Sequence, residues 1–291
     1  MNRLALPLVL LFSGCAGLKS LDVSSMSGGR LQSVDFAKVA KGVNQLRKGF
    51  ADISESEEHF IGRAVAAQVL TRYRPLNDPG LNAYAQKVAQ AVALASDRPA
   101  TFKGYHVQIL DTSEVNAFAA PGGFLFVTKG LLQLVKSEDE LAGVLAHEVA
   151  HVAKKHGLKT IQTSRLTSAF TTLGSEAAKS YTPQQVSQLT TAFEGAVEDV
   201  VNKLVVNGYS RDKEYEADEF AAQYAKAANY DPGALKTFLA RLDKFQGDSG
   251  GMFKTHPPAA KREVELGTQS PSSAYKRSSE RGRRFSAAVQ L

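Results

Sequence analysis

Residues 137–157 read SEDELAGVLAHEVAHVAKKHG, and this stretch predicts the central helix of the molecule. Ser137 followed by Glu140 forms a capping box, which marks the start of a helix. The basic residues 154–156 favour the C-terminal end of a helix dipole, and Gly157 stands where a C′ glycine commonly ends a helix. Between these signals runs an apolar stripe at helical spacing, formed by Leu141, Val144, Leu145, Val149 and Val152. We therefore expect one helix at about 138–156.

The segment HEVAH at 147–151 gives this helix a chemical role. His147 and His151 are four residues apart, so they lie on one helical face about a turn apart, and both imidazoles can reach one zinc ion. Glu148 projects toward the open coordination position, where it can take the proton of an attacking water. The alternative is a pair of polar side chains on a partly exposed helix. The spacing favours a zinc site with its own general base.

A catalytic zinc site needs a third protein ligand. The pattern HExxHxxGxxH is not met, because Lys154 and Gly157 occupy its glycine and third histidine positions. His156 lies five residues beyond His151, about 140° further round the helix, so it should point away from the ion. We expect it to be an end-of-helix group or a contact of a ligand rather than a ligand.

The better candidate for the third ligand lies in residues 210–218, SRDKEYEAD. Ser210 can cap a new helix after Gly208, and Glu214 and Asp218 then share one face at i,i+4. Glu214 can bind the zinc ion while Asp218 accepts a hydrogen bond from the free N–H of a ligand histidine. Such a pair alone is frequent on charged surface helices. Beside an HExxH segment that lacks a third ligand, it indicates the rest of the site.

Together these segments resemble peptidase family M48, a family of zinc metallopeptidases. The resemblance covers about residues 50–265 and rests on four motifs in order: NAFAAPGGFLFV at 116–127, HEVAHVAKKHG at 147–157, SRDKEYEAD at 210–218, and THPP at 255–258 followed by Arg262. It implies a mostly helical, gluzincin-like fold and proteolysis of membrane-associated or misfolded envelope proteins. It also implies one zinc ion per chain, with Glu148 as the base and, as ligands, His147, His151 and Glu214. The chain looks closer to the soluble periplasmic and lipoprotein members than to the integral-membrane ones.

The first of these motifs predicts two strands, 116–120 and 124–128, joined by a turn at Pro121-Gly122-Gly123. An edge strand at this place could pair with an extended substrate backbone. This makes three residues candidates for substrate binding: Asn116, Ala117 and Phe118. Alternatively, the hairpin only packs on the active helix.

The last motif supplies two further candidate catalytic residues, His256 and Arg262. Both could stabilise the oxyanion of a tetrahedral intermediate. His256 could instead take the open zinc position and hold the enzyme latent, or it could be an ordinary loop residue.

The remaining pattern predicts a mostly α fold with a small β-sheet (α+β). Capping boxes or N-cap–proline pairs announce helices at about 54–72, 78–95, 183–206 and 232–246. Alternating apolar residues predict a strand at 105–110. A chain of 291 residues can bury a sizeable core.

The N-terminus is typical of an exported lipoprotein. Arg3 precedes a short apolar run at 4–12, and Phe12-Ser13-Gly14-Cys15 resembles a bacterial lipobox. We expect a signal peptide at 1–14, lipidation of Cys15 and a flexible tether at 15–50. A short buried helix with an incidental thiol is the alternative. The resemblance to Gram-negative lipoproteins implies, with Ala16 after the cysteine, sorting to the outer membrane, with the domain facing the periplasm.

The net charge of +6 resides mainly in the last residues of the chain. The body, with a metallopeptidase domain expected at 51–265, is close to neutral, so we expect no nucleic-acid partner. We expect residues 266–291 to form a basic, flexible tail. With Cys15 as the single cysteine, neither an internal disulfide nor a cysteine metal site can form.

The sequence therefore predicts a zinc endopeptidase that acts on polypeptides and is held at the membrane by a lipid. Two alternatives remain at this point. One is a latent zinc protein that acts mainly as a chaperone-like binder of envelope proteins. The other is a non-catalytic lipoprotein in which the zinc is structural.

Overall fold

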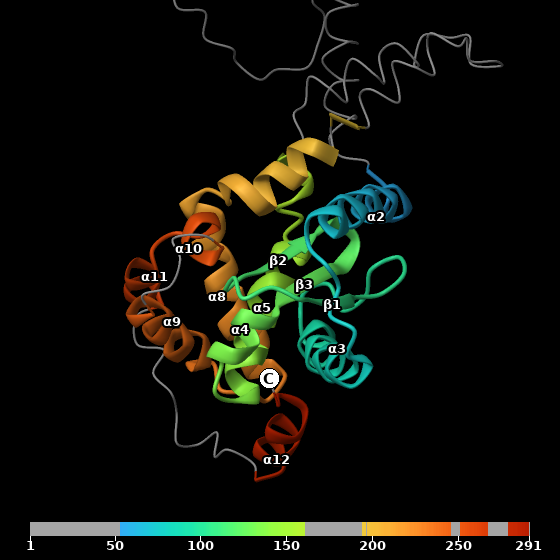
Figure 1. Ribbon diagram of the computed structural model, residues 1–291. Helices are drawn as coiled ribbons and strands as arrows, with labels where there is room; N and C mark the ends of the chain where they lie inside the picture. Colours follow the sequence, from blue (N-terminus) through green and yellow to red (C-terminus); the bar gives the residue numbers. More distant parts are fainter. Residues whose placement is uncertain (1–52, 161–193, 196, 246–250, 267–278, 291) are drawn as a thin grey trace, which may run out of the picture. The chain divides into compact units, whose positions relative to one another are not determined.

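The computed structural model describes residues 53–160, 194–195, 197–245, 251–266 and 279–290, which belong to one compact unit, Gly49–Leu291. The predicted signal peptide, the lipidation site at Cys15 and the whole tether at 15–50 lie outside the described residues. In the part that is described, no helix has the length and apolar character needed to cross a bilayer. The prediction of a mostly helical chain with a small sheet is confirmed (Figure 1).

The elements follow one another in this order: helices α2 (Glu55–Arg72) and α3 (Pro79–Leu94), strands β1 (His106–Leu110) and β2 (Ala117–Ala120), the 3₁₀ turn η1 (Pro121–Gly123), strand β3 (Phe124–Thr128), helices α4 (Lys129–Leu134) and α5 (Glu138–Ala153), the 3₁₀ turn η2 (Leu158–Thr160), the π-helix η3 (Lys203–Asn207), and helices α8 (Arg211–Ala227), α9 (Ala234–Lys244), α10 (Met252–Thr255), α11 (Ala259–Glu265) and α12 (Ser279–Ala288).

The three strands form one sheet in the order β1-β3-β2. β1 runs parallel to β3, with His106 opposite Phe124, and β2 runs antiparallel to β3, with Phe118 opposite Phe126. The sheet therefore places β2, the strand predicted to meet a substrate, at an edge.

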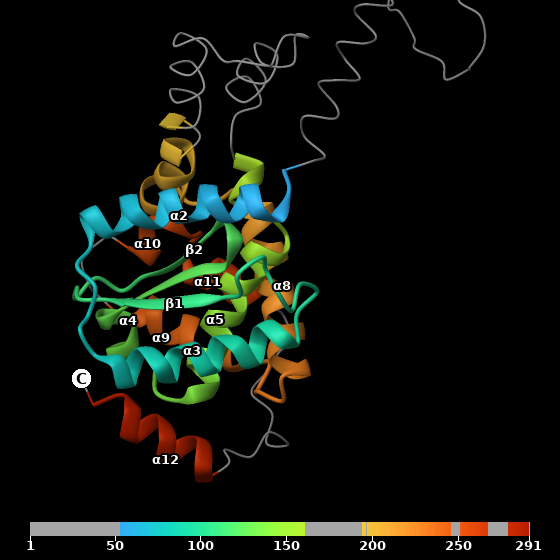
Figure 2. The same cartoon turned by 90° about the vertical axis from the view of Figure 1, so that its right-hand side faces the viewer.

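Alternate residues of the strands pack into two separate hydrophobic cores, one on each face of the sheet. Ala117, Leu125 and Val127 pack with α3, α5 and α8, whereas Phe118 and Phe126 pack with α2 and the helical residues 197–204. Figure 2 shows α2 on one side of the sheet and α3 on the other. Because both faces are covered, β2 and β3 are apolar along nearly their whole length, as strands buried on two sides are.

The turn between β2 and β3 is held close to α2. Gly122 has φ 76°, and a Cβ at this position would lie 2.9 Å from the Cα of His59. Its N–H donates to the buried carboxylate of Glu58 at 3.0 Å. Glycine is therefore required here both for the left-handed backbone and for the close approach of α2.

Helix α5 begins as predicted but ends earlier. Ser137 caps it by accepting from the N–H of Glu140 at 3.2 Å. At the other end Lys155, rather than Gly157, takes the left-handed conformation with φ 56°. The N–H groups of Lys155 and His156 bond to the carbonyls of Val152 and His151, which is a Schellman motif.

The expected end at residue 156 was therefore wrong. A Cβ at Gly157 would lie 3.2 Å from Pro121 and 3.3 Å from the hydroxyl of Tyr209. The glycine permits this close contact instead of ending the helix.

The other predicted helices have mixed outcomes. α2, α3 and α9 match their predicted ranges closely, and Asp78 caps α3 by accepting from Leu81 N–H at 2.9 Å. The start of the helix predicted at 183–206 lies outside the described residues. Residues 197–202 are helical and continue into the π-helix η3, which ends at Asn207, just before Gly208.

The expectation of a flexible tail at 266–291 needs correction for residues 279–290, while residues 267–278 lie outside the described part of the chain. Residues 279–288 form α12, which packs on α3 and α5 through Phe285 and Ala288. Arg284 forms an ion pair with the buried Glu138, and Arg281 forms one with Asp139 at 3.0 Å. Two of the arginines expected in a solvated tail thus bind the acidic start of α5.

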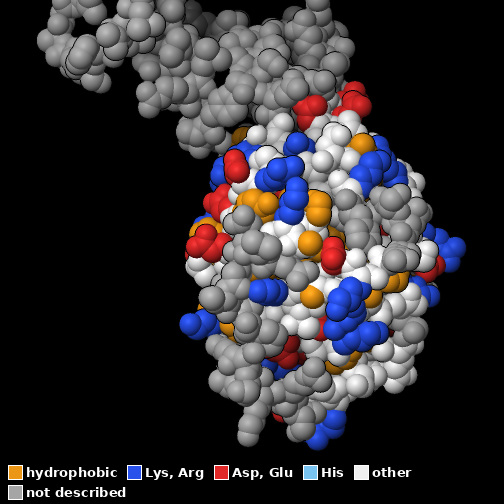
Figure 3. All heavy atoms as spheres, turned by 90° about the vertical axis from the view of Figure 1, so that its left-hand side faces the viewer, with side chains coloured by type: hydrophobic (Ala, Val, Ile, Leu, Met, Phe, Trp, Pro, Cys, Tyr) orange, Lys and Arg blue, Asp and Glu red, His pale blue; other side chains and the backbone are white. Residues whose placement is uncertain are grey.

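Charges of both signs mix on the surface. On the face shown in Figure 3, Lys and Arg side chains lie among Asp and Glu side chains. This mixture agrees with the near-zero net charge that the composition gives for the chain without its C-terminal residues.

Candidate metal centre

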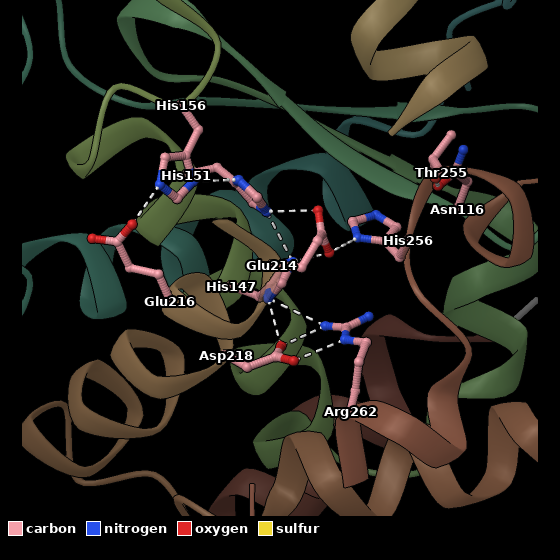
Figure 4. Close-up of polar contacts among 10 residues, drawn as sticks. All are labelled: Asn116, His147, His151, His156, Glu214, Glu216, Asp218, Thr255, His256 and Arg262. Atoms are coloured by element: carbon pink, nitrogen blue, oxygen red, sulfur yellow. Dashed lines mark hydrogen bonds and ion pairs between the residues drawn. The ribbon is translucent and has the colours of Figure 1, made fainter. Parts of the chain in front are cut away.

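Helices α5 and α8 pack against each other and bring the candidate metal ligands together. His147 and His151 lie in the middle and last turns of α5, and Glu214 lies in the first turns of α8. All three side chains are at most 2% exposed. His256, in the loop between α10 and α11, points at Glu214 from the other side (Figure 4).

The donor atoms of these four residues converge. The two Nε2 atoms of His147 and His151 are 3.0 Å apart, and each lies 3.6 Å from one carboxylate oxygen of Glu214. His256 Nδ1 lies 2.6 Å from Glu214 Oε2. One ligand atom from each residue lies within 4.8 Å of the others, so all four can surround one ion.

The chemistry of this donor set fits zinc. Imidazole nitrogens and a carboxylate oxygen are its usual ligands in four-coordinate sites. Glu214 Oε1 is buried and has no hydrogen-bond partner among the described residues. A buried carboxylate oxygen left in this state is costly unless a cation or donor satisfies it, and a metal ion would do so.

The local field sets the protonation of the ligands. Burial raises the pKa of Glu214, but His256, His147 and His151 outweigh it and hold this pKa well below its usual range. The pKa of His151 is lowered well below its ordinary value by burial and then by His147. The carboxylate is thus ionised and the imidazole of His151 neutral, which are the forms that bind a metal.

The pKa of His147, unlike that of His151, is raised, because two carboxylates face this ring. Burial and Arg262 lower its pKa, yet Asp218 and Glu214 outweigh them and raise it to about 9. A metal ion must therefore displace a proton from this ring.

Glu148 lies beside the ligands without taking part in their contacts. The side chain is 1% exposed, and its Oε1 has no hydrogen-bond partner in the described part of the chain. Burial raises its pKa, while His147 and His256 pull that pKa down. An unpartnered carboxylate of raised pKa next to a metal site is suited to accept and return a proton.

Asp218 and Arg262 support His147 from behind. Asp218 Oδ1 lies 2.8 Å from His147 Nδ1, the contact expected from the spacing of Glu214 and Asp218. Arg262 donates to both oxygens of Asp218, at 2.9 and 2.5 Å, and its Nη2 lies 3.2 Å from His147 Nδ1. Burial raises the pKa of Asp218, but Arg262 outweighs it and lowers this pKa to about 2.

This geometry changes the interpretation of Arg262. Two of its three nitrogens contact Asp218, so the guanidinium holds a carboxylate instead of standing free beside a reacting carbonyl. The sequence suggested an oxyanion role, whereas the contacts are those of a positioning residue.

His156 contacts a candidate ligand, one of the two roles considered for it. The Schellman turn brings its Nδ1 to 2.9 Å from His151 Nδ1, and its Nε2 lies 3.1 Å from Glu216. His151 therefore has a supporting chain of its own, as His147 has in Asp218 and Arg262.

Sequence reasoning missed Tyr209, which lies just before α8. Its ring stacks on His151 with centroids 4.5 Å apart and planes at 20°. Its hydroxyl is buried without a described partner, and burial, followed by Glu148 and Glu214, raises its pKa well above the usual value. A lone tyrosine in a loop carries no spacing signal, so the sequence alone could not have identified it.

The candidate substrate-binding residues are buried. Asn116 lies 3.5 Å from Thr255 and 3.3 Å from Glu114 through its amide group. Ala117 and Phe118 belong to the two cores, and β2 lies beside η3. Their side chains are thus part of the fold, and β2 could meet a substrate only through its backbone.

The comparisons with known proteins agree with this geometry. The model of peptidase family M48 matches residues 79–269. The chain is 30% identical over 237 residues to mitochondrial metalloendopeptidase OMA1 of Schizosaccharomyces pombe, covering 79% of this chain and 66% of that protein. It is 34% identical over 184 residues to metalloprotease YcaL of Escherichia coli, covering 62% and 67%.

A third relative is much longer than the matched region. The chain is 26% identical over 212 residues to the beta-barrel assembly-enhancing protease of Escherichia coli, covering 70% of this chain but 42% of that protein. The match therefore reaches one part of that relative only. The family model nonetheless spans all the candidate ligands and Glu148. The chain belongs to peptidase family M48, a family of metallopeptidases.

Proposed function

We propose that this protein is a zinc endopeptidase that degrades unfolded or misassembled proteins of the bacterial cell envelope. The observation that carries the proposal is the convergence of His147, His151 and Glu214 beside the unpartnered carboxylate of Glu148. Relatives named beta-barrel assembly-enhancing protease support a substrate in the envelope. Lipidation of Cys15 and attachment to the outer membrane, facing the periplasm, are part of the same proposal.

The ligands would be His147, His151 and Glu214, and the ion would polarise the scissile carbonyl and acidify the attacking water. Glu148 takes the proton of that water and returns it to the leaving amine. Its burial favours the first transfer, because a carboxylate of raised pKa accepts a proton more readily than an ordinary glutamate does.

The surrounding residues keep the ligands in place. Asp218 accepts from His147 Nδ1 and so leaves Nε2 free for the ion, and Arg262 fixes Asp218. The ring of Tyr209 lies flat on His151 and limits its rotation.

A polypeptide would bind along the edge of β2 through backbone hydrogen bonds. Because η3 lies beside β2, we expect η3 to move when an extended substrate binds. Ala117 and Phe118 would then hold β2 in position by packing their side chains in the two cores.

One observation favours a second candidate, a latent form of the same enzyme. His256 lies 2.6 Å from Glu214 and offers a fourth donor to the cluster. With His256 on the ion, the open position of a catalytic site is closed. The protein would then hold zinc and bind envelope proteins without cleaving them until His256 leaves.

The test is zinc content together with casein cleavage for the wild type, Glu148→Gln and His256→Ala. One zinc per chain in all three, with cleavage lost only in Glu148→Gln, supports the enzyme. Zinc without cleavage in the wild type, and cleavage in His256→Ala, supports the latent form. Absence of zinc in the wild type would refute both.

A further inference from the structure

Two large aromatic side chains are exposed near the start of α2. Phe60 in α2 is 56% exposed, and Phe102 in the loop before β1 is 45% exposed. The ring of His59 bridges them, with centroid distances of 5.9 Å to Phe60 and 5.7 Å to Phe102. Figure 2 shows the start of α2 and the 95–105 loop at the same end of the sheet. We define the aromatic–basic patch as Phe60, Phe102, Arg63, Lys103 and His106.

The charge of this patch is positive. Arg63, Lys103 and His106 are exposed, and Lys103 Nζ lies 5.2 Å from the centre of the Phe102 ring. The pKa of the neighbouring His59 is lowered by burial and further by these three basic groups, so their fields overlap.

Two described acidic groups at this end already have cationic partners. Glu58 binds Arg98 at 2.9 Å, and Asp97 binds Lys154 at 2.6 Å. Among the described carboxylates, none lies within 4 Å of Arg63 or Lys103. The two cations are therefore available to an anionic partner.

Exposed aromatic rings with cations beside them match the chemistry of a lipid headgroup layer. Aromatic rings enter the boundary between headgroups and acyl chains, while Lys and Arg bind lipid phosphates. Single exposed apolar residues are common on protein surfaces, but here two rings and three basic side chains occupy one place.

The position along the chain points to the same partner. Phe60 lies 45 residues after Cys15, the predicted lipidation site. One acyl anchor alone gives weak membrane attachment, and a second signal makes it stable. A basic surface at the start of the folded domain is well placed to be that second signal.

We propose that the aromatic–basic patch binds an anionic phospholipid surface and orients the domain on the membrane. The proposal does not depend on zinc or on proteolysis. It predicts that the phenyl rings of Phe60 and Phe102 leave water when the protein meets anionic lipid.

The chain contains no tryptophan, which allows a direct test on the full protein. Phe102→Trp and, separately, Phe60→Trp each introduce a single fluorophore into the patch. With phosphatidylglycerol vesicles we expect emission to move to shorter wavelength and to be quenched by brominated lipid, but not with phosphatidylcholine vesicles. An acyl anchor alone would hold the protein on either vesicle without distinguishing them.

Phe245→Trp is the matched control, because Phe245 is 42% exposed at the end of α9, away from the patch. Its emission should not change. In the Phe102→Trp background, Arg63→Glu with Lys103→Glu should weaken binding to phosphatidylglycerol about thirty-fold. This follows from about 1 kcal/mol for each of the two lost cations, since 1.4 kcal/mol corresponds to a factor of ten.

Three results would overturn the proposal. One is unchanged emission of both patch tryptophans with phosphatidylglycerol. Another is an equal shift of the Phe245→Trp control. The third is an equal shift produced by polyglutamate without lipid, which would identify the patch as a site for an acidic polypeptide instead.

Discussion

Helix α5 carries two buried polar clusters, and they differ in how completely their polar atoms are satisfied. At its start, Glu138 accepts from the hydroxyls of Tyr84 and Tyr230, both at 3.0 Å, and pairs with Arg284. Glu140 accepts from Arg241 at 2.8 Å and from Lys136 N–H at 2.8 Å. Every carboxylate at this end has donors that match it.

The middle and end of the same helix are different. Glu148 Oε1 and Glu214 Oε1 are buried without a hydrogen-bond partner among the described residues, and three histidines face Glu214. Buried polar groups that are fully paired stabilise a fold, whereas buried polar groups without partners indicate a site for an ion or a substrate. The comparison separates a structural cluster from a functional one, and each prediction below tests that separation.

The largest expected effect is that of metal removal. If the ligand cluster holds zinc, chelation should abolish activity and lower the free energy of unfolding by about 4 kcal/mol at zinc a thousand-fold above its Kd. Thermal unfolding with and without EDTA measures this. Glu138→Gln should keep the EDTA-sensitive difference, and Glu214→Ala should lack it. An EDTA effect that survives in Glu214→Ala would place the metal elsewhere.

Substitution in the structural cluster should act on stability alone. Glu138→Gln removes the charge facing Arg284 and leaves donors poorly matched, so we expect a loss of about 2 kcal/mol in unfolding free energy. The urea midpoint measures this, and activity per folded molecule should be unchanged. Arg284→Gln is the companion variant, and it should cost at least as much, because it leaves the buried carboxylate of Glu138 without its cation. A large loss of activity at unchanged stability would contradict the separation.

The same cluster predicts a dependence on pH. Burial raises the pKa of Glu138, but its bonds to Arg284, Tyr84 and Tyr230 outweigh burial and lower this pKa from its ordinary value of 4.5. A lowered folded-state pKa means that the stabilisation is complete above the ordinary value and declines as pH falls through the folded-state value. The difference in unfolding free energy between wild type and Glu138→Gln should therefore shrink on acidification below about pH 4.5. A difference that grows at low pH would reverse this assignment.

The smallest expected effect lies at the end of α5. Lys155 occupies a left-handed conformation with φ 56°. Lys155→Gly should raise the unfolding free energy by roughly 0.5–1 kcal/mol, because glycine adopts this conformation without strain. Denaturant unfolding measures the gain. Gly157→Ala, where a Cβ would lie 3.2 Å from Pro121, should instead destabilise.

The sequence predicted those parts of the molecule that depend on neighbours along the chain. The start of α5, the three strands and the shared faces of His147 with His151 and of Glu214 with Asp218 all follow from local spacing. Local spacing did not predict the Schellman turn at Lys155, because a lysine in the left-handed region is uncommon. Gly157 is the residue type that more commonly ends a helix. The role of that glycine depends on Pro121, which is distant in sequence.

The spacing of residues along the chain could not predict contacts between residues that are distant in sequence. Arg262 could be noted as a candidate, but only the fold shows that Asp218 engages its guanidinium. Likewise, Arg284 and Glu138 lie 146 residues apart, and no local pattern marks them as partners. Composition alone indicated a charged C-terminal tail. The carboxylates that pair with its arginines lie far away in sequence, at the start of α5.

The docking of α12 has a consequence for the length of the folding unit. The family match ends at residue 269 and begins at residue 79, so both α12 and α2 lie beyond it. Yet α2 supplies Ile61, Val65 and Val69 to one core, and α12 supplies the cation that faces Glu138. A chain cut to the matched region would keep every candidate catalytic residue. It would also expose part of one face of the sheet to water and remove the cation from the carboxylate at the head of the helix that bears those residues.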